Sequence, residues 1–264
     1  MNYTNKTIWI TGASSGIGEA LAYEFAKYKP KLILSSRKIA GLEKVKHRCD
    51  SIGTESHVVP IDLSNAGQIK DTADFVTNKF GRIDVLVNNA GIGQRSYIVE
   101  TPLEIDRRIM EVDFFGHVAL AKAILPVMLK NKQGQIIVMS SLSGLFGFPL
   151  RSGYCAAKHA LHGFFETVLA EHYKDGIRVT IICPGRIKTN ISLNALTASG
   201  NPHGQMDEGQ LNGISVEKAA HKMVNAAKRE KKIYVIGGKE TIMVPIKKFF
   251  PGIFYKLVIR INPI

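Results

Sequence analysis

Residues 6–18 read KTIWITGASSGIG, and this stretch decides the fold. Its first half, Lys6–Thr11, is a short run rich in β-branched residues, which is typical of a buried strand. Three glycines follow, Gly12, Gly16 and Gly18, and helical spacing of apolar residues begins at the second of them. A strand, a glycine-rich turn and a helix in this order predict a phosphate-binding loop. The glycines let the backbone approach an anion closely, and the helix N-terminus offers free N–H groups to it.

Strands and helices continue to alternate along the chain. Apolar runs of strand length occupy six further segments, at 31–36, 56–61, 83–88, 135–140, 178–183 and 232–236. Segments of helical period lie between the strands, at 16–28, 40–51, 66–80, 103–131, 153–174 and 215–229. Such alternation predicts right-handed βαβ units. We therefore expect an α/β fold: a single-domain, Rossmann-like, doubly wound sheet of about seven parallel strands with helices on both faces, spanning residues 1–264.

Composition excludes several classes of protein. With 264 residues, 45% of them hydrophobic and 22% charged, the chain can fill a core without disulfides or metals, so it is neither disordered nor fibrous. The three cysteines, Cys49, Cys155 and Cys183, are odd in number and lack metal-binding spacing, which favours reduced, buried thiols. The longest charge-free run, 133–150, is too polar to cross a bilayer, and the first strand starts too early for a signal peptide. These features predict a cytoplasmic protein.

The positive charge is concentrated near the C-terminus. Of the net charge of +13, residues from Lys228 onward carry +7, with nine basic and two acidic residues. The body lacks the basic stripe with stacking aromatics of a nucleic-acid binder, so no nucleic-acid partner is expected. The extension 239–264 mixes aromatics with lysines and is broken by Pro251 and Gly252. Two interpretations stay open for it: packing on the substrate pocket or a partner subunit, or peripheral contact with a membrane.

The segment 190–213 interrupts the alternation of strands and helices. It is rich in Asn, Ser, Gly and Gln and follows the carboxyl end of the sixth strand. Loops at that edge of a doubly wound sheet line the ligand crevice. We expect a substrate lid here; a disordered surface insertion is the alternative.

The end of the second strand predicts the cofactor. It reads Leu34-Ser35-Ser36-Arg37-Lys38 and contains no acid to bind a ribose 2′-hydroxyl. Ser36 can donate a hydrogen bond to a 2′-phosphate, and Arg37 can pair with it bidentately. NADP(H) is therefore expected in preference to NAD(H).

Further motifs lie at strand ends on the same edge of the sheet. Asn88-Asn89-Ala90-Gly91 closes the fourth strand, Ser140-Ser141 the fifth, and Pro184-Gly185 follows the sixth. Tyr154 and Lys158 open the next long helix, and residues four apart share one helix face. A Lys⁺ about 4 Å away stabilises a phenolate by roughly 4 kcal/mol before screening. We therefore expect Lys158 to lower the tyrosine pKa from near 10 toward the neutral range.

Together, in this order, these motifs resemble the classical short-chain dehydrogenase/reductase superfamily, from the glycine loop through Thr189 and more loosely to the last strand. The resemblance implies that Tyr154 is the general acid/base, that Lys158 tunes it and holds the nicotinamide ribose, and that Ser141 hydrogen-bonds the substrate oxygen. It places Asp62 at the adenine. The implied cofactor-binding residues are Gly12, Ser14, Ser15, Gly16, Ile17, Gly18, Ser36, Arg37, Asp62, Asn88, Ala90, Gly91, Tyr154, Lys158, Pro184, Gly185, Ile187 and Thr189. For Asn88 a purely structural role stays open.

One residue departs from the family pattern. The family usually has an Asn in the long helix before the active serine, where it holds a water that connects to the lysine. Here Asp113 occupies that position and joins the catalytic candidates. Its carboxylate would offset part of the positive field that lowers the tyrosine pKa. An altered pH profile and a weakened proton relay both remain open.

The segments 114–120 and 184–192 look most like the dehydrogenase/reductase member-seven branch, whose members are often membrane-associated and act on lipophilic carbonyls. The resemblance implies a steroid-, retinoid- or lipid-like ketone or aldehyde substrate. A 3-oxoacyl thioester reductase and a non-catalytic NADP-binding scaffold or sensor are the alternatives. The family's long helices imply a homodimer or homotetramer. His117, His159 and His162 are expected on helix surfaces, and no metal site is expected.

Overall fold

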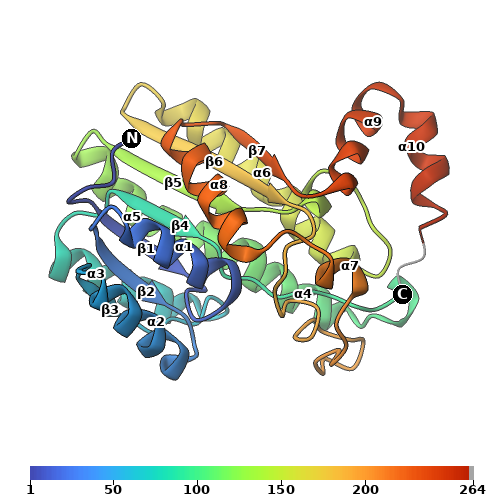
Figure 1. Cartoon of the computed structure of the whole chain (residues 1–264), viewed down its shortest axis with the longest axis horizontal. Coiled ribbons are helices and arrows are strands. Elements are labelled where there is room, and N and C mark those ends of the chain that lie inside the picture. The colour runs from blue at the N-terminus through green and yellow to red at the C-terminus, as the bar shows by residue number, and fades with distance from the viewer. Residues whose placement is uncertain (262–264) are drawn as a thin grey trace.

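Seven strands form one parallel sheet in the computed structural model, which describes residues 1–261. Residues 262–264 of the predicted extension lie outside the described residues. The strand order is β3-β2-β1-β4-β5-β6-β7 (Figure 1), which confirms the predicted doubly wound sheet. The strands are β1 (Thr7–Thr11), β2 (Lys31–Ser35), β3 (Ser56–Val58), β4 (Val85–Asn88), β5 (Gly134–Met139), β6 (Ile177–Pro184) and β7 (Ile233–Ile236). Because β1 pairs with both β2 and β4, a crevice for a ligand opens at the carboxyl ends of these strands.

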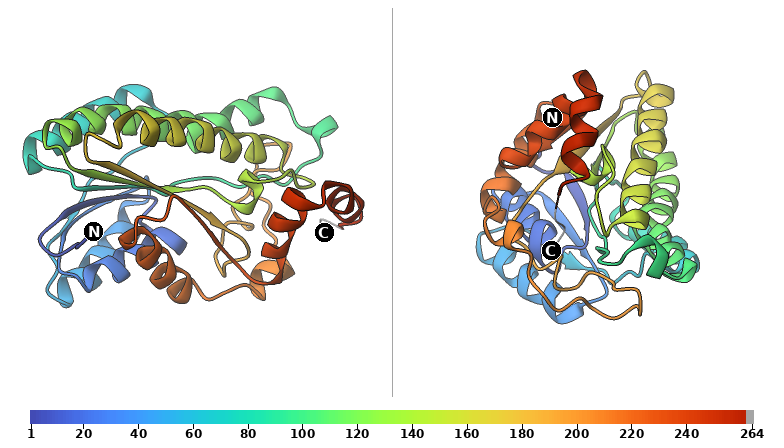
Figure 2. Two further views of the ribbon diagram at one scale, coloured as in Figure 1. Left: turned by 90° about the horizontal axis from the view of Figure 1, so that it is seen from above. Right: turned by 90° about the vertical axis from the view of Figure 1, so that its right-hand side faces the viewer.

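Helices cover both faces of the sheet (Figures 1 and 2). On one face lie α1 (Gly16–Ala26), α2 (Ile39–Ser51) and α8 (Val216–Lys228); on the other lie α3 (Ala66–Phe80), α5 (Gly116–Lys130) and α6 (Ser152–His172). Each face has its own core. Ile8 and Ile10 of β1 point into the first core, and Trp9 between them points into the second. Both faces of the strands are therefore buried, which is why the strand sequences are continuously apolar.

The helix predicted over 103–131 has three parts. It consists of α4 (Leu103–Met110), a π-helical turn η2 (Glu111–Phe115) and α5, and the N–H of Gly116 donates to the carbonyl of Glu111 five residues earlier. Taken as one helix, Leu103–Lys130 is long and apolar enough to cross a membrane, but 44% of its most apolar window is buried in the fold. Its buried residues pack against the sheet and α3, so here the helix is part of a core layer.

The structure corrects one further predicted segment and excludes the disordered alternative for another. The third strand was expected over Ser56–Ile61 but ends at Val58, because it is an edge strand that pairs with β2 over three residues. The segment 190–213 is folded rather than disordered: it contains α7 (Glu208–Leu211), and bridges join Leu196 to Gln94 and Ile187 to Ile214.

The C-terminal extension packs beside the loop that follows β5. It comprises η4 (Lys239–Ile242), α9 (Met243–Phe249) and α10 (Pro251–Val258), which break at Phe250 as the Pro-Gly pair predicts. Phe254 is buried against Phe146, with ring centroids 5.4 Å apart. Lys247 Nζ donates to the carbonyl of Leu145 at 2.6 Å. The extension projects from the end of the sheet near α7 (Figure 1).

The three cysteines are buried, as predicted. Cys49, Cys155 and Cys183 are free thiols, and all three are buried.

Candidate active site

The loop between β1 and α1 requires its glycines. Gly12 and Gly16 have φ of +65° and +60°, in the left-handed region. A Cβ on Gly18 would lie 2.2 Å from the carbonyl oxygen of Gly12, and one on Gly12 would lie 2.8 Å from Ala90 Cα. Ser15 caps α1 without a side-chain hydrogen bond to a residue in the described chain. The first N–H groups of α1 can therefore serve an anion, which fits a dinucleotide pyrophosphate.

The other predicted residues of this loop have distinct surroundings. Ser14 lies against α2, with its Cβ 3.0 Å from the position of a Cβ on Gly41. Ile17 packs onto the first core rather than into the crevice. It can therefore contribute to a cofactor site mainly through its backbone.

Residues at the ends of β2 and β3 come together. Arg37 is half-exposed, and its Nη1 lies 3.9 Å from Asp62 Oδ2. Ser36 Oγ accepts a hydrogen bond from the N–H of Lys38 at 3.0 Å. Burial alone would raise the pKa of Asp62, but hydrogen bonds from Ser64 and the charge of Arg37 lower it below its ordinary value. The residues predicted for the ribose phosphate and the adenine thus share one edge of the crevice.

The Asn-Asn-Ala-Gly motif links β4 to β1 and to the helix behind it. Thr11 Oγ1 accepts hydrogen bonds from the N–H groups of Asn89 and Ala90, at 3.0 and 3.1 Å. Asn88 is buried, and its Nδ2 donates to the carbonyl of His117 at 3.2 Å. This contact supports the structural role left open for Asn88. A Cβ on Gly91 would lie 3.0 Å from Asp113 Oδ2.

Ser141, Tyr154 and Lys158 gather at the end of β5. Ser141 precedes the turn η3 (Leu142–Gly144), and its Oγ accepts from the N–H of Ser143 at 3.1 Å. Tyr154 is the third residue of α6, and Lys158 Nζ lies 5.5 Å from the centre of its ring. Burial raises the pKa of Tyr154, and Asp113 adds to this, while Lys158 and the nearby Ser141 oppose it. The net direction is upward, opposite to the expected lowering.

Asp113 forms a buried ion pair with Lys158. Its Oδ2 lies 3.1 Å from Lys158 Nζ, and its Oδ1 accepts from the N–H of Ile92 at 2.8 Å. Lys158 Nζ also donates to the carbonyl of Met139 at 3.2 Å. Burial alone would lower the pKa of Lys158, but the charges of Asp113 and Tyr154 raise it above its ordinary value. The ammonium therefore stays charged. Burial raises the pKa of Asp113, but the charge of Lys158 and the hydrogen bond from Ile92 favour its carboxylate form, which cancels part of the ammonium's field at Tyr154.

Two histidines expected on helix surfaces belong to the site, which corrects that prediction. His117 is buried with its Nε2 2.7 Å from the carbonyl oxygen of Ala90, and burial lowers its pKa to about 3. His162 Nε2 lies 3.0 Å from Ser140 Oγ, which donates to the carbonyl of Lys158 at 3.1 Å. The spacing of four between Asp113 and His117 was the available signal, since it places both on one helix face. His159 is exposed, as predicted.

The segment after β6 reaches the glycine loop. The N–H of Gly185, next to Pro184, donates to the carbonyl of Ile236 at 2.7 Å, and Ile187 is buried in the first core. A Cβ on Gly16 would lie 3.5 Å from Thr189 Cγ2. The predicted cofactor-binding residues that follow β6 thus lie beside the glycine loop.

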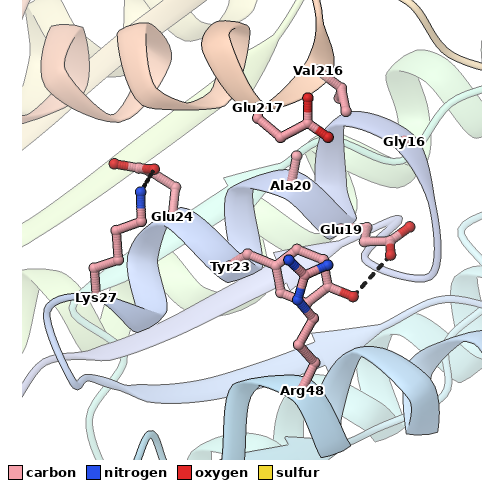
Figure 3. Close-up of a pocket in the computed structure, with 9 residues that line it drawn as sticks. All are labelled: Gly16, Glu19, Ala20, Tyr23, Glu24, Lys27, Arg48, Val216 and Glu217. Carbon is pink, nitrogen blue, oxygen red and sulfur yellow. Dashed lines mark hydrogen bonds and ion pairs between the residues drawn. The ribbon is translucent and has the colours of Figure 1, made fainter. Parts of the chain in front are cut away.

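A pocket of about 260 Å³ lies away from these residues, between α1, α2 and α8 (Figure 3). Several of its side chains bond to one another: Lys27 Nζ is 2.6 Å from Glu24, and the Tyr23 hydroxyl donates to Glu19 at 2.8 Å. Among the residues of the predicted site, it includes Gly16 alone. We assign it no part in the chemistry.

Comparisons with known proteins agree with this geometry. The family model described as short chain dehydrogenase matches residues 6–199. The chain is 38% identical over 261 residues to dehydrogenase/reductase SDR family member 7B of Bos taurus, covering 96% of this chain and 80% of that protein. It is 44% identical over 200 residues to dehydrogenase/reductase SDR family member 7 of Homo sapiens, covering 73% of this chain and 58% of that protein.

Solved structures share the fold. A short chain dehydrogenase/reductase from Burkholderia phymatum in complex with NAD superposes with a TM-score of 0.83 at 23% identity, covering 100% of this chain and 98% of that one. An alcohol dehydrogenase from Thermococcus sibiricus complexed with 5-hydroxy-NADP gives a TM-score of 0.74 at 26% identity, covering 88% and 94%. The chain therefore belongs to the short-chain dehydrogenase/reductase family, with relatives among its members 7 and 7B.

Proposed function

We propose that this protein is an NADP(H)-dependent oxidoreductase that acts on a carbonyl or alcohol substrate. The observation that carries the proposal is the gathering of Ser141, Tyr154 and the charged Lys158 at the carboxyl edge of the sheet, beside a loop that requires its glycines. A bound nicotinamide would supply the hydride in reduction and accept it in oxidation.

The residues of the chain have separate tasks in this proposal. Ser141 Oγ donates a hydrogen bond to the substrate oxygen, where negative charge develops. Tyr154 gives a proton to that oxygen in reduction and removes it in oxidation. Lys158 stabilises the phenolate by its positive charge, and Asp113 sets how much of that charge Tyr154 experiences.

Arg37 and Ser36 support NADP(H) over NAD(H). Arg37 Nη1 is 3.9 Å from Asp62, beyond ordinary hydrogen-bond range, so the guanidinium can turn toward a 2′-phosphate and pair with it. Of the solved structures with this fold, one is complexed with 5-hydroxy-NADP and another with NAD, so they support a nicotinamide dinucleotide of either kind.

The first test follows loss of NADPH absorbance against a broad carbonyl panel. We expect the wild type to turn over lipophilic ketones or aldehydes, and Tyr154→Phe to lose about 10²- to 10⁴-fold in kcat while it still binds NADPH by calorimetry. A preference for 3-oxoacyl thioesters would select the thioester reductase instead. NADPH binding without turnover of any carbonyl, in wild type and Asp113→Asn alike, would favour the non-catalytic scaffold.

We also propose that the C-terminal extension contacts an anionic membrane surface. Phe249 and Phe250 are 65% and 60% exposed, and Ile253 and Ile259 are also exposed. Four basic residues lie among them: Lys247, Lys248, Lys256 and Arg260. Exposed aromatics and isoleucines interleaved with cations suit the interface of an acidic bilayer.

Cosedimentation with phosphatidylserine-containing vesicles tests this contact. Phe249→Ser/Phe250→Ser should reduce the bound fraction several-fold and leave Phe254 on Phe146 in place, unlike truncation after Gly238. Neutral vesicles are the control for charge. Equal binding by wild type and the double variant would leave packing on a partner subunit as the role of this surface.

Two further proposals concern the whole chain. We propose a homodimer or homotetramer that pairs through the long helices, because the family's long helices commonly do so. The buried, free cysteines support a reducing, cytoplasmic location. Light scattering at micromolar concentration measures the assembly directly.

A further inference from the structure

Two arginines share one carboxylate beside Tyr154. Arg95 contacts Asp207 through two nitrogens, with Nε 3.3 Å from Oδ1 and Nη2 closer still to Oδ2. Arg151 Nη2 lies 3.2 Å from the same Oδ2. The side chains of Arg95, Arg151 and Asp207 are only 6%, 19% and 24% exposed. We call these three residues the arginine cluster.

The arginine cluster joins three segments that are far apart in sequence. Arg95 follows β4, Arg151 immediately precedes α6, and Asp207 lies in the segment 190–213. Gln94, next to Arg95, accepts a hydrogen bond from the N–H of Tyr154 at 3.1 Å. Leu196, from the same segment as Asp207, packs in one apolar cluster with Tyr154. The cluster is therefore adjacent to the residue proposed to transfer the proton.

The charges of the arginine cluster do not balance. Two guanidinium groups face one carboxylate, and although burial and the neighbouring Arg95 lower the pKa of Arg151 to about 10, it remains charged at neutral pH. Glu208, the next acid along the chain, is exposed. Asp106 Oδ1 lies 2.5 Å from the position of a Cβ on Gly153, and Asp106 forms no ion pair with either arginine among the described residues. One positive charge thus remains without a carboxylate partner and largely shielded from water. Arg151 Cζ lies 4.7 Å from the centre of the Phe148 ring, which offsets part of the cost, and a further anion would offset more.

We propose that Arg95 and Arg151 bind an acidic group of the substrate, a carboxylate or a phosphate. When no substrate is bound, the carboxylate of Asp207 pairs with the two arginines instead and holds the segment 190–213 closed as a latch. Arginine suits this task because its planar guanidinium pairs bidentately with both kinds of anion. This inference rests on the proposed function, since it assigns the carbonyl substrate an acidic group. When the acidic group of the substrate replaces Asp207 at the arginines, the segment 190–213 would be released.

Matched pairs of ketones test the inference. One pair is 6-oxoheptanoate with its methyl ester, and the other is 5-oxohexyl phosphate with 5-oxohexan-1-ol, so that carboxylate and phosphate are separated. We expect kcat/KM to favour an acidic member at least tenfold in the wild type. Arg151→Gln should lower the acid-to-neutral ratio at least tenfold, and the exposed Arg107→Gln should leave it unchanged.

Asp207→Asn makes the decisive comparison because it removes no cation. It should lower KM for the acidic member several-fold, since the arginines lose their internal partner, whereas a merely structural latch would raise KM for both members of a pair. If Arg151→Gln unfolds, Asp207→Asn alone decides.

Failure of the inference and failure of the proposed function are distinguishable. Turnover of both members of each pair at equal kcat/KM would overturn the anion site and leave the oxidoreductase intact. If the wild type reduces none of the ketones, NADPH-saturated Tyr154→Phe is titrated with each pair by calorimetry. Tighter binding of an acidic member then supports the site, and equal binding overturns it.

Discussion

At the scale of single residues, Asp113 is the charged neighbour of the proposed Tyr154–Lys158 pair. It lies 3.1 Å from Lys158 in a place closed to water, and both residues are essentially unexposed. In such surroundings a carboxylate acts strongly on its neighbours, because there is little solvent to screen it. The site therefore has a weaker positive field at Tyr154 than a neutral amide at position 113 would leave.

Replacing Asp113 by Asn should shift the pH profile toward acid. The change removes the negative charge that helps to raise the pKa of Tyr154, so this pKa should fall. Oxidation, which needs the phenolate, should begin at lower pH. Reduction needs the protonated tyrosine, so as the pH rises its rate should begin to decline at a lower pH than in the wild type. Curves of kcat/KM against pH for the two proteins measure the shift, and coincident curves would contradict it.

Replacing Arg37 by Ala should change cofactor preference. Loss of one charged hydrogen-bonding partner for a 2′-phosphate weakens binding by about 1.5–3 kcal/mol, which is roughly 10- to 100-fold. KM for NADPH should rise accordingly, and KM for NADH should change little. Lys38→Ala is the matched control at the next position. An equal effect on both cofactors would show that Arg37 does not contact the 2′-phosphate.

At the scale of elements, the sequence predicted those whose signals are local. β1, the glycine loop and α1 follow from residues 6–18, and the spacing of four places Tyr154 and Lys158 on one face of α6. The π-helical turn at Glu111–Phe115 could not be predicted, because the buried residues on either side keep the spacing of an ordinary helix. The arginine cluster was missed for another reason: its members are far apart in sequence, and tertiary folding alone brings them together.

Phe254 anchors the last helix of the extension. Phe254 is the buried residue of α10, whereas its neighbour Tyr255 is exposed. Phe254→Ala should detach α10 locally, so that trypsin cleaves at Lys247, Lys248 or Lys256 at least several-fold faster. The global Tm should fall by less than about 2 °C, since terminal elements open independently of the core. Tyr255→Ala is the control. Equal cleavage of the two variants would show that Phe254 does not hold the extension.

At the scale of the whole molecule, His117 ties stability to pH. Its pKa is about 3 in the folded protein, against about 6.5 when exposed, because burial disfavours the charged ring. The folded state therefore takes up this proton less readily than the unfolded state. The stability due to neutral His117 is complete above pH 6.5 and is lost as the pH falls toward 3.

Urea unfolding at pH 7.5 and 5.5 checks this linkage. Over the range below pH 6.5, His117 should contribute a loss in the free energy of unfolding of about 1.4 kcal/mol per pH unit. His117→Gln should reduce the difference between the two pH values by that contribution, whatever its stability at pH 7.5. His47→Gln, at an exposed position on α2, should leave the difference as in the wild type.

The chain between β6 and α8 lies beside both proposed ligand sites. Thr189 lies over the glycine loop, and Asp207, in the same stretch, lies against the arginines beside Tyr154. Gln210 ties the two parts together by donating to the carbonyl of Ile187 at 3.1 Å. Dinucleotide and substrate would then leave through a common gate. A single opening rate would govern both departures, so a variant with a looser gate would release oxidised dinucleotide faster and hold its product for a shorter time.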